Sequence, residues 1–350
     1  MGTPEFAVES LKRLVEGGYN VVAVVTQPDK PVGRHQDTLQ PSQVKLYAVE
    51  HGLPVLQPVK MKDPEFVEQL RSYQADLQVV VAFRMLPEVV WAMPKFGTFN
   101  VHAALLPQYR GAAPINWAVI NGEKETGVTT FFLDHDIDTG RIIMQKRFPI
   151  PESADVEYVY DGLMHLGADL ALETIDALIA AGGNIESMPQ EKLIGEGVEL
   201  KSAPKIFKET CRIDFHKPAK QVYDFVRGLS PYPGSWTEIK KKAPVVIFED
   251  ADGEMPEATA HPAQQKSAAK IQVLKIFKTS LTEFSRGVAP VGSLRVFEKK
   301  LQVACLDQWL NIEELQLSGK KRMDAAAFLN GMKDIAYYEC QKAQETEEEW

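Results

Sequence analysis

Hydrophobic positions in the first half of the chain alternate between helical and strand patterns. In residues 5–15, apolar side chains recur every three or four positions, which predicts a helix. Residues 21–25 are all apolar, as is typical of a strand covered on both faces of a parallel sheet. A helix beginning at Asp63 and Pro64 and a buried strand at 77–83 repeat the alternation. The pattern predicts a doubly wound, Rossmann-like α/β domain with ligands at the carboxyl ends of its strands.

A long helix, expected over residues 155–181, closes this domain, which we place at residues 1–190. The charged, Gly- and Pro-containing stretch 191–208 is predicted to be a linker to a second domain at 209–333. Short strands separated by turn signals predict that the second domain is a small β-barrel. We expect them at 212–215, 245–248, 271–277, 292–297, 301–305 and 315–317, with helices at 218–229 and near Asp324. Residues 334–350 are expected to form an acidic tail whose last stretch, E-T-E-E-E-W, is frayed.

The charge of the chain is unevenly distributed. The whole chain of 350 residues carries −9, but residues 1–202 carry −10, residues 203–333 carry +6 and residues 334–350 carry −5. A basic second domain beside an acidic first domain is typical of a polyanion-binding module attached to another activity.

Two observations limit the class of protein. Three cysteines without paired spacing predict neither a disulfide framework nor a zinc site, and no run approaches the ~18 apolar residues of a membrane span. With no charged-then-apolar leader before the first helix, we expect a reduced, cytoplasmic protein and a monomer. The first domain also lacks G-x-G-x-x-G and G-x-x-x-x-G-K-[ST], so a dinucleotide or nucleoside triphosphate is a poor candidate ligand.

Candidate chemistry is concentrated in residues 99–140. Asn100 and His102 alternate with apolar neighbours, so on a strand they project from one face. A second apolar strand at 128–133 leads into a loop that contains Asp134, Asp136 and Asp138. Taken singly, such residues more often cap a turn or satisfy the backbone. If the loop folds back to His102, however, an amide, an imidazole and a carboxylate meet.

The motifs N-V-H, L-L-P-x-x-R-G-A-A-P-I and D-x-D-T-G, in this order, resemble those of the folate-dependent formyltransferases. The likeness extends from G-T-P-E-F-A at residue 2 to G-K-K-R-M at residue 319, and is strongest to the members that act on methionyl-tRNA. It implies transfer of the formyl group of 10-formyltetrahydrofolate to the amino group of initiator methionyl-tRNA, for translation initiation. It also implies that the second domain is an OB-like barrel that binds the tRNA.

Formyl transfer to an amine requires a neutral amine and a polarised carbonyl. His102 suits the general base, and Asn100 can donate its amide N–H to the developing oxyanion. Asp138 is expected to hold His102 in one tautomer and to stabilise its charged form. We expect neither a metal nor a covalent nucleophile.

The resemblance also implies binding residues. Those expected around the folate donor are Phe83, Arg84, Met85, Leu86, Leu105, Leu106, Pro107, Asp134 and Asp136. Those expected to bind the tRNA substrate are Phe6, Lys320, Lys321, Arg322 and Arg34, which lies in the Pro/Gly-rich insertion 27–43. Arg84 stands where the family has glycine.

Two other functions are compatible with the motifs. Formyltransferases that act on a nucleotide-linked amino sugar share the N-x-H, L-L-P-x-x-R-G and D-T-G elements, and a tRNA-binding protein without catalysis would share the basic domain. The basic second domain and the P-D-x-P-x-G-R loop argue against the first, and the intact Asn100, His102 and Asp138 argue against the second.

In the family, the G-T-P-x-F turn follows a short apolar strand in the centre of the sheet. Here Met1 directly precedes Gly2. We therefore expect that the native polypeptide begins upstream and that the structure has a gap beside the strand at 21–25.

Overall fold

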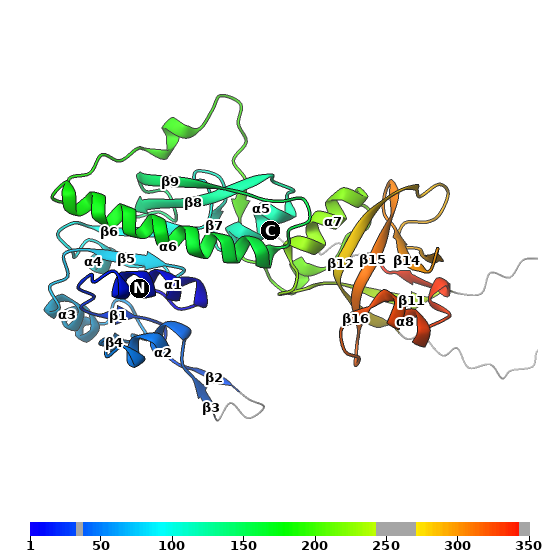
Figure 1. Cartoon of the computed structure of the whole chain (residues 1–350), viewed down its shortest axis with the longest axis horizontal. Helices are drawn as coiled ribbons and strands as arrows, with labels where there is room; N and C mark the ends of the chain where they lie inside the picture. The colour runs from blue at the N-terminus through cyan, green and yellow to red at the C-terminus, as the bar shows by residue number, and fades with distance from the viewer. Residues whose placement is uncertain (33–37, 243–270, 343–350) are drawn as a thin grey trace, which may run out of the picture. The chain divides into compact units, whose positions relative to one another are not determined.

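The computed structural model describes residues 1–32, 38–242 and 271–342 (Figure 1). The chain divides into two compact units, Met1–Ile206 and Phe207–Trp350. The division lies within the stretch 191–208 that was predicted to be a linker. Arg34, the strand predicted at 245–248 and the last eight residues of the predicted tail lie outside the described residues.

The first unit is an α/β layer structure, as predicted. Its helices are α1 (Glu5–Glu16), α2 (Gln43–Glu50), α3 (Pro64–Ser72), α4 (Glu88–Trp91), α5 (Pro114–Ile120), α6 (Val156–Ala180) and the 3-10 helix η1 (Gln190–Leu193). Its strands are β1 (Val24–Val25), β2 (Lys30–Val32), β3 (Thr38–Gln40), β4 (Val55–Leu56), β5 (Gln78–Val81), β6 (Thr98–His102), β7 (Arg110–Gly111), β8 (Glu125–Phe132), β9 (Ile142–Pro149) and β10 (Ser202–Ala203). The β2–β3 hairpin lies in the 27–43 insertion and projects from the unit in Figure 1.

The main sheet has the order β5-β6-β8-β9. β5 is parallel to β6, but β8 runs antiparallel to β6 and to β9, so the sheet is mixed rather than wholly parallel. β1 and β4 form a separate parallel pair. Because β8 is antiparallel, the loop after it begins near Thr98, at the start of β6, and must run back to approach His102.

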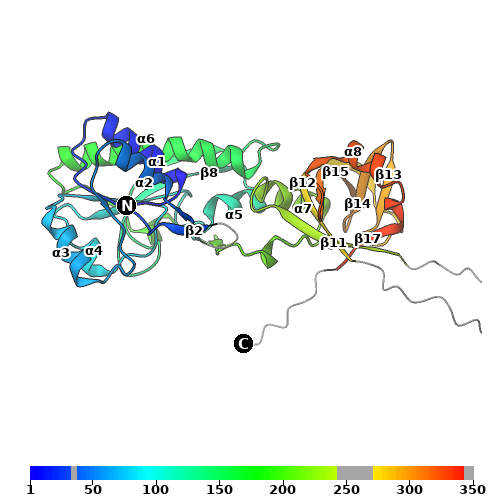
Figure 2. The ribbon, with the colours of Figure 1, turned by 90° about the horizontal axis from the view of Figure 1, so that it is seen from below.

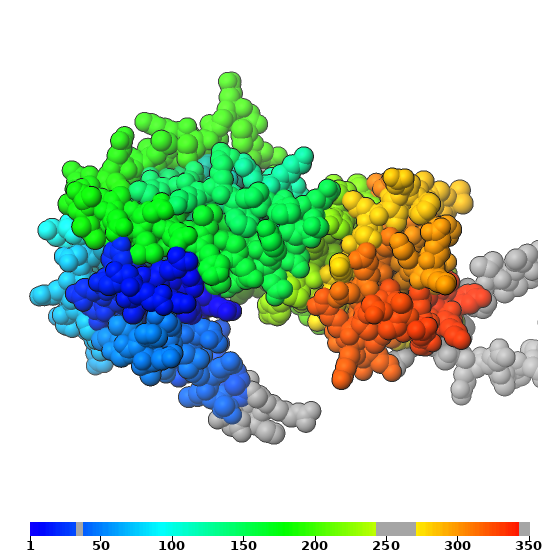
Figure 3. Space-filling view, in the orientation of Figure 1, coloured from blue at the N-terminus to red at the C-terminus, as the bar shows by residue number. Residues whose placement is uncertain are grey.

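The helix α6 covers one face of this sheet, where it lies along β8 in both ribbon views (Figures 1 and 2). Asp155 caps it by accepting a bond from the Tyr158 N–H (3.0 Å), and Thr174 Oγ1 lies 2.9 Å from Thr130 Oγ1 of β8. Its buried leucines Leu163, Leu170 and Leu178 fill the core. The dark-blue α1 lies against the green α6 in Figure 3.

The first two residues connect the main sheet to the β1–β4 pair. The Met1 amino group donates to the Val79 carbonyl (2.7 Å), the Met1 carbonyl accepts from the Val81 N–H (2.9 Å), and the Gly2 N–H donates to the Val25 carbonyl (3.0 Å). Met1 and Gly2 thus lie between β1 and β5 and bond to both.

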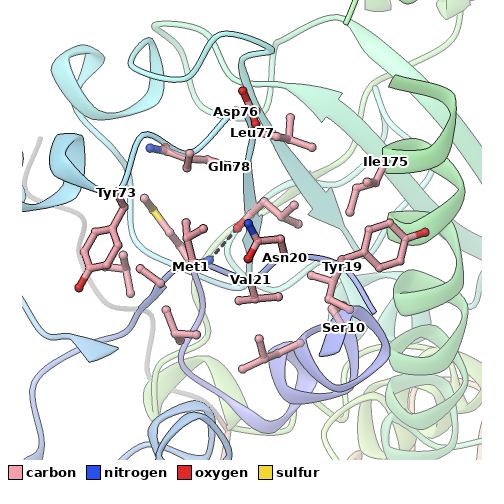
Figure 4. Close-up of a pocket in the computed structure, with 18 of the residues that line it drawn as sticks. Met1, Ser10, Tyr19, Asn20, Val21, Tyr73, Asp76, Leu77, Gln78 and Ile175 are labelled. Atoms are coloured by element: carbon pink, nitrogen blue, oxygen red, sulfur yellow. Dashed lines mark hydrogen bonds between the residues drawn. The ribbon is translucent and has the colours of Figure 1, made fainter. Parts of the chain in front are cut away.

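A cavity of about 500 Å³ borders these two residues (Figure 4), as expected. Residues 21–25, residues 77–79 and α6 residues including Ile175 line it. Of the strand predicted at 21–25, only Val24 and Val25 form a strand, and these two residues pair with β4. Residues 21–23 line the cavity and have no strand partner among the described residues.

The second unit is a β-barrel. Its elements are the 3-10 helices η2 (Glu209–Cys211) and η3 (Ile335–Tyr337), the helices α7 (Ala219–Gly228) and α8 (Ala325–Gly331), and the strands β11 (Ser235–Lys241), β12 (Gln272–Ser285), β13 (Leu294–Phe297), β14 (Lys300–Ala304), β15 (Gln308–Leu317), β16 (Met323–Asp324) and β17 (Tyr338–Cys340). The strand order is β13-β14-β15-β12-β11-β17, with β16 paired to β15. A bridge between Ser293 and Glu339 joins the two ends of the sheet and nearly closes the barrel.

Two predictions for this unit were wrong. The expected strand at 212–215 is only a single bridge from Arg212 to Trp236, because the chain turns into α7 soon after it. The expected tail at 334–350 contains β17, whose Cys340 pairs with Ile239 of β11 and is buried in the barrel core. The described part of this segment is ordered by pairing with β11 and by the buried side chains of Ile335 and Cys340.

Candidate active site

The strand β6 places Asn100 and His102 on one face, as the alternation predicts. On the adjacent strand β8, Asn100 lies opposite Phe131 and His102 lies opposite Thr129. Val101 lies opposite Thr130, on the other face, which α6 covers. The His102 side chain is 6% exposed and meets the Phe131 ring edge-on, with centroids 6.4 Å apart. The imidazole is therefore held in a largely buried position rather than free on the surface.

One nitrogen of His102 is bound by the backbone. Nε2 lies 2.9 Å from the carbonyl oxygen of Tyr109. A carbonyl can only accept, so Nε2 carries the proton and Nδ1 is the unprotonated nitrogen of the neutral ring. The Tyr109 carbonyl thus favours the Nε2–H tautomer of the neutral ring, a role that the sequence analysis assigned to Asp138.

Asp138 does fold back to His102. Its Oδ2 lies 3.8 Å from His102 Nδ1 and accepts a hydrogen bond from the Gly111 N–H (2.9 Å). The residue has a φ of +57°, which an aspartate adopts more readily than most side chains. Asp134 stabilises the start of the loop by accepting bonds from the Thr139 hydroxyl (2.8 Å) and the Asp136 N–H (3.2 Å).

The amide of Asn100 is in an unusual state. Its Oδ1 is buried and has no hydrogen-bond partner, although the residue itself is partly exposed. An unsatisfied buried amide oxygen costs about 1–3 kcal/mol, so this one calls for a functional or structural explanation. Asn100 therefore has an unmet capacity for hydrogen bonding beside the imidazole and the carboxylate.

The loops expected around the folate donor meet at Leu133. Phe83, Leu86 and Leu133 share one apolar cluster, and Leu133 also packs against a second cluster, which contains Leu106. Loop 83–86, loop 105–107 and the start of loop 133–138 are therefore neighbours, although they lie far apart in the sequence. Met85 remains 65% exposed.

Arg84 does not point a free charge into this region. Its guanidinium donates to the carbonyl of Val59 (2.9 Å) and also to that of Pro58. The arginine therefore ties this loop to the segment after β4, a structural use that the glycine of the family pattern cannot serve.

The residues expected to bind the tRNA substrate have different surroundings. Phe6 is only 5% exposed and lies in the core, with its ring centroid 5.3 Å from that of Tyr160. This burial does not support a role for Phe6 in binding the tRNA substrate. Lys320 and Lys321 are exposed. Arg322 donates from Nε and Nη2 to the same oxygen of Glu314, Oε2 (2.9 and 2.5 Å).

Three residues of the site were missed by the sequence analysis. Tyr109 presents its carbonyl to His102, Gly111 presents its N–H to Asp138, and Gln190 binds the carbonyls of Asp138 and Gly140 (2.8 Å each) while accepting from Arg110. Of these, only Gly111 has a sequence signal, the R-G pair in the motif, because a glycine fits its φ of +127°.

Together these groups could assist acyl transfer to an amine. The unprotonated nitrogen of the neutral imidazole faces a carboxylate, and the side-chain amide of Asn100, whose NH2 group can donate, lies on the same strand face. Such a set can accept a proton, stabilise the resulting imidazolium and polarise a carbonyl. Within residues 1–32, 38–242 and 271–342, no group of three or more His, Cys, Asp or Glu side chains could hold a metal ion.

Comparison with protein families agrees with this class of chemistry. Residues 1–175 match the model of the formyl transferase family, and residues 205–333 match its formyl transferase C-terminal domain. The chain belongs to the formyl transferase family.

Its relatives by sequence are more specific. The chain is 56% identical over 339 residues to the methionyl-tRNA formyltransferase of Parabacteroides distasonis, covering 97% of this chain and 96% of that protein. It is 58% identical over 332 residues to the methionyl-tRNA formyltransferase of Phocaeicola vulgatus, covering 95% and 94%.

Solved structures share the fold at low identity. A sugar 3N-formyltransferase crystallised with dTDP and 5-N-formyl-THF superposes with a TM-score of 0.58 at 18% identity, covering 91% of this chain and 97% of that one. An N-formyltransferase of Helicobacter canadensis, in complex with folinic acid and dTDP-3-aminofucose, superposes with a TM-score of 0.56 at 20% identity, covering 89% of this chain and 96% of that one.

Among the described residues, no helix combines the length and the apolar character that a membrane span requires.

Proposed function

We propose that this enzyme transfers the formyl group of 10-formyltetrahydrofolate to the amino group of initiator methionyl-tRNA. The geometric observation that carries the proposal is the approach of Asp138 Oδ2 to within 3.8 Å of His102 Nδ1, beside Asn100. The identity of 56% to a full-length methionyl-tRNA formyltransferase supports the acceptor. A cytoplasmic location and a monomeric state complete the proposal and rest on the sequence.

The protein groups would act in the following roles. Asn100 donates an amide N–H to the oxygen of the formyl carbon as negative charge develops there. His102 accepts the proton of the attacking amine at Nδ1, since Nε2 is already bonded to the Tyr109 carbonyl. Asp138, which already accepts the Gly111 N–H, stabilises the imidazolium that results.

The folate donor would bind at the loops that meet around Leu133. These residues suit the donor, because the partly exposed apolar side chains of Phe83 and Leu105 can cover a pterin ring while the exposed Asp134 and Asp136 offer acceptors for its amino group. The unpartnered Oδ1 of Asn100 adds a polar group beside them. The basic part of the second unit, within residues 203–333, would bind the phosphates of the tRNA through exposed lysines such as Lys320 and Lys321.

One assay separates the possible acceptors. The wild-type enzyme is incubated with 10-formyltetrahydrofolate and either methionyl-tRNA or a dTDP-linked amino sugar, and the formylated product is measured. We expect formylation of methionyl-tRNA at least 100-fold faster than of the sugar. Preferential formylation of the sugar would overturn the choice of acceptor, and binding of tRNA without formylation of either substrate would identify a catalytically silent protein.

A further inference from the structure

The last residues of the first unit pack directly against the loop that supports His102 and Asp138. We call residues 199–204 the strap. Its strand β10 pairs in parallel with β7, Ser202 opposite Arg110 and Ala203 opposite Gly111. This stretch falls within the segment that the sequence predicted to be a plain linker.

Backbone bonds fasten the strap at both ends of β7. The Tyr109 N–H donates to the Lys201 carbonyl (2.7 Å), and the Ala113 N–H donates to the Ala203 carbonyl (3.1 Å). The approach is close at Gly111, where a Cβ would lie 2.4 Å from the Ala203 carbonyl oxygen. Only glycine fits here, so the spacing between loop and strap is tightly defined.

Side chains add a second set of bonds. Gln108 donates to the Glu199 carbonyl (3.0 Å) and accepts from the Lys201 N–H (2.8 Å), so one amide clamps two peptide groups of the strap. Trp117 donates its indole N–H to the Pro204 carbonyl (2.8 Å).

Tyr109 is held at both its backbone and its hydroxyl. The hydroxyl donates to Glu123 (2.5 Å), and the same carboxylate accepts from the Lys201 ammonium (2.6 Å). Burial, reinforced by this bond to Glu123, raises the pKa of Tyr109, which keeps the hydroxyl protonated and able to donate. The residue has a φ of +60°, a conformation that a tyrosine keeps only when its surroundings enforce it.

The loop residues that the strap holds contact the reacting groups directly. Tyr109 supplies the carbonyl that fixes the tautomer of His102, and Gly111 supplies the N–H that orients Asp138. We propose that the strap is a positioning element of the active site, which keeps His102 Nδ1 unprotonated and facing Asp138 by holding the Tyr109–Gly111 loop. The proposal rests on the proposed function for the role of His102, but its structural part concerns the tautomer alone.

The test removes the clamp without touching the reacting groups. In Gln108→Ala, both bonds to the strap are lost. Trp117→Phe keeps an aromatic ring but loses the bond to Pro204. Gln69→Ala makes the same change as the first variant on the exposed face of α3 and serves as the matched control. Gln108→Glu keeps the acceptor for Lys201 and should restore part of any loss.

The direct readout is the tautomer of His102 in the substrate-free enzyme. Long-range ¹H–¹⁵N spectra of histidine-labelled protein distinguish Nε2–H from Nδ1–H, and His102→Gln assigns the signal among the seven histidines. We expect Nε2–H in the wild type and in Gln69→Ala, and a mixture of the two tautomers in Gln108→Ala and Trp117→Phe.

The kinetic readout is formylation of methionyl-tRNA. A displaced catalytic group typically costs about 10-fold to 100-fold in rate, so we expect a fall of that size in kcat for Gln108→Ala, with unchanged KM for tRNA and unchanged Tm. An unaltered tautomer with unaltered kcat would overturn the proposal. A fall in activity that follows only a fall in Tm, with the tautomer unchanged, would also overturn it.

The two proposals fail in distinguishable ways. If the wild type does not formylate methionyl-tRNA, the proposed function is wrong, whereas the spectra still decide the role of the strap. If the wild type is active and the variants match it in every readout, the function stands and the strap has no positioning role.

Discussion

Replacing Asp138 by asparagine should remove one charge beside His102 and little else. The two side chains have nearly the same shape, and the asparagine oxygen can still accept from the Gly111 N–H. Asp138 and His102 are 13% and 6% exposed, so solvent screens their interaction only weakly. The substitution therefore tests the charge of Asp138 separately from its place in the loop.

The size of the effect follows from the distance. At an effective dielectric constant of about 20, opposite unit charges 3.8 Å apart attract each other by about 4 kcal/mol. If the imidazolium forms at the rate-limiting step, the asparagine variant loses this stabilisation in the transition state. The rate should then fall by roughly 10³-fold, within the range of about 10²- to 10⁴-fold typical of a positioned acid or base.

The assay is single-turnover formylation of methionyl-tRNA at saturating folate donor, with tRNA affinity measured in parallel. Glu186→Gln, an exposed charge change in the same unit, is the control and should match the wild type. A rate for Asp138→Asn within about 10-fold of the wild type would refute the electrostatic reasoning. A loss of tRNA affinity as large as the loss of rate would place Asp138 in binding rather than in catalysis.

Further predictions concern the base, the tRNA surface and the first residue. His102→Ala should lower the single-turnover rate by about 10²- to 10⁴-fold at unchanged tRNA affinity, and a rate within a few fold of wild type would exclude it as the base. Neutralising Lys320 and Lys321 should reduce the slope of log tRNA affinity against log salt concentration by about one unit per phosphate contact, measured by titration at several salt concentrations. Arg322→Gln should change this slope less, because Glu314 already pairs with Arg322. Equal slopes for the lysine and arginine variants would contradict this prediction. In a polypeptide that begins at Met1, burial lowers the pKa of the α-amino group from about 8 in the unfolded chain to about 5 in the folded protein. Between pH 5 and pH 8, unfolding therefore takes up a proton. The free energy of unfolding should fall by up to about 4 kcal/mol as the pH is lowered from 8 to 5. N-terminal acetylation should remove this component, and identical pH profiles in denaturant titrations of both forms would contradict it.

Several features were predictable because they depend on local geometry. The alternation of residues 99–102 predicts that Asn100 and His102 share a face, since neighbouring side chains of any strand point in opposite directions. The long helix begins one residue after its predicted start, because Asp155 is a capping residue in the sequence as well as in the structure. The barrel strands β13 and β14 were likewise expected to within two residues.

Other local predictions failed because a partner was decisive. Residues 21–25 have an ideal strand composition, yet only Val24 and Val25 form β1, since strand geometry requires a neighbour for its hydrogen bonds. Conversely, the segment of β17, which was expected to belong to an acidic tail, forms a strand because β11 provides that neighbour. Composition describes what a segment prefers, and pairing decides whether that preference is realised.

The sequence by itself determined which groups could perform chemistry, and the tertiary structure decided how they are held. The motifs name Asn100, His102 and Asp138, but the tautomer of the histidine depends on the carbonyl of Tyr109, a backbone atom that every residue has. That carbonyl is held in turn through bonds such as the one from Gln108 to residue 199, across 91 positions of the chain. Backbone groups carry no signature of their own in the sequence, so their part in the site appears only once the strap and the loop are brought together in space.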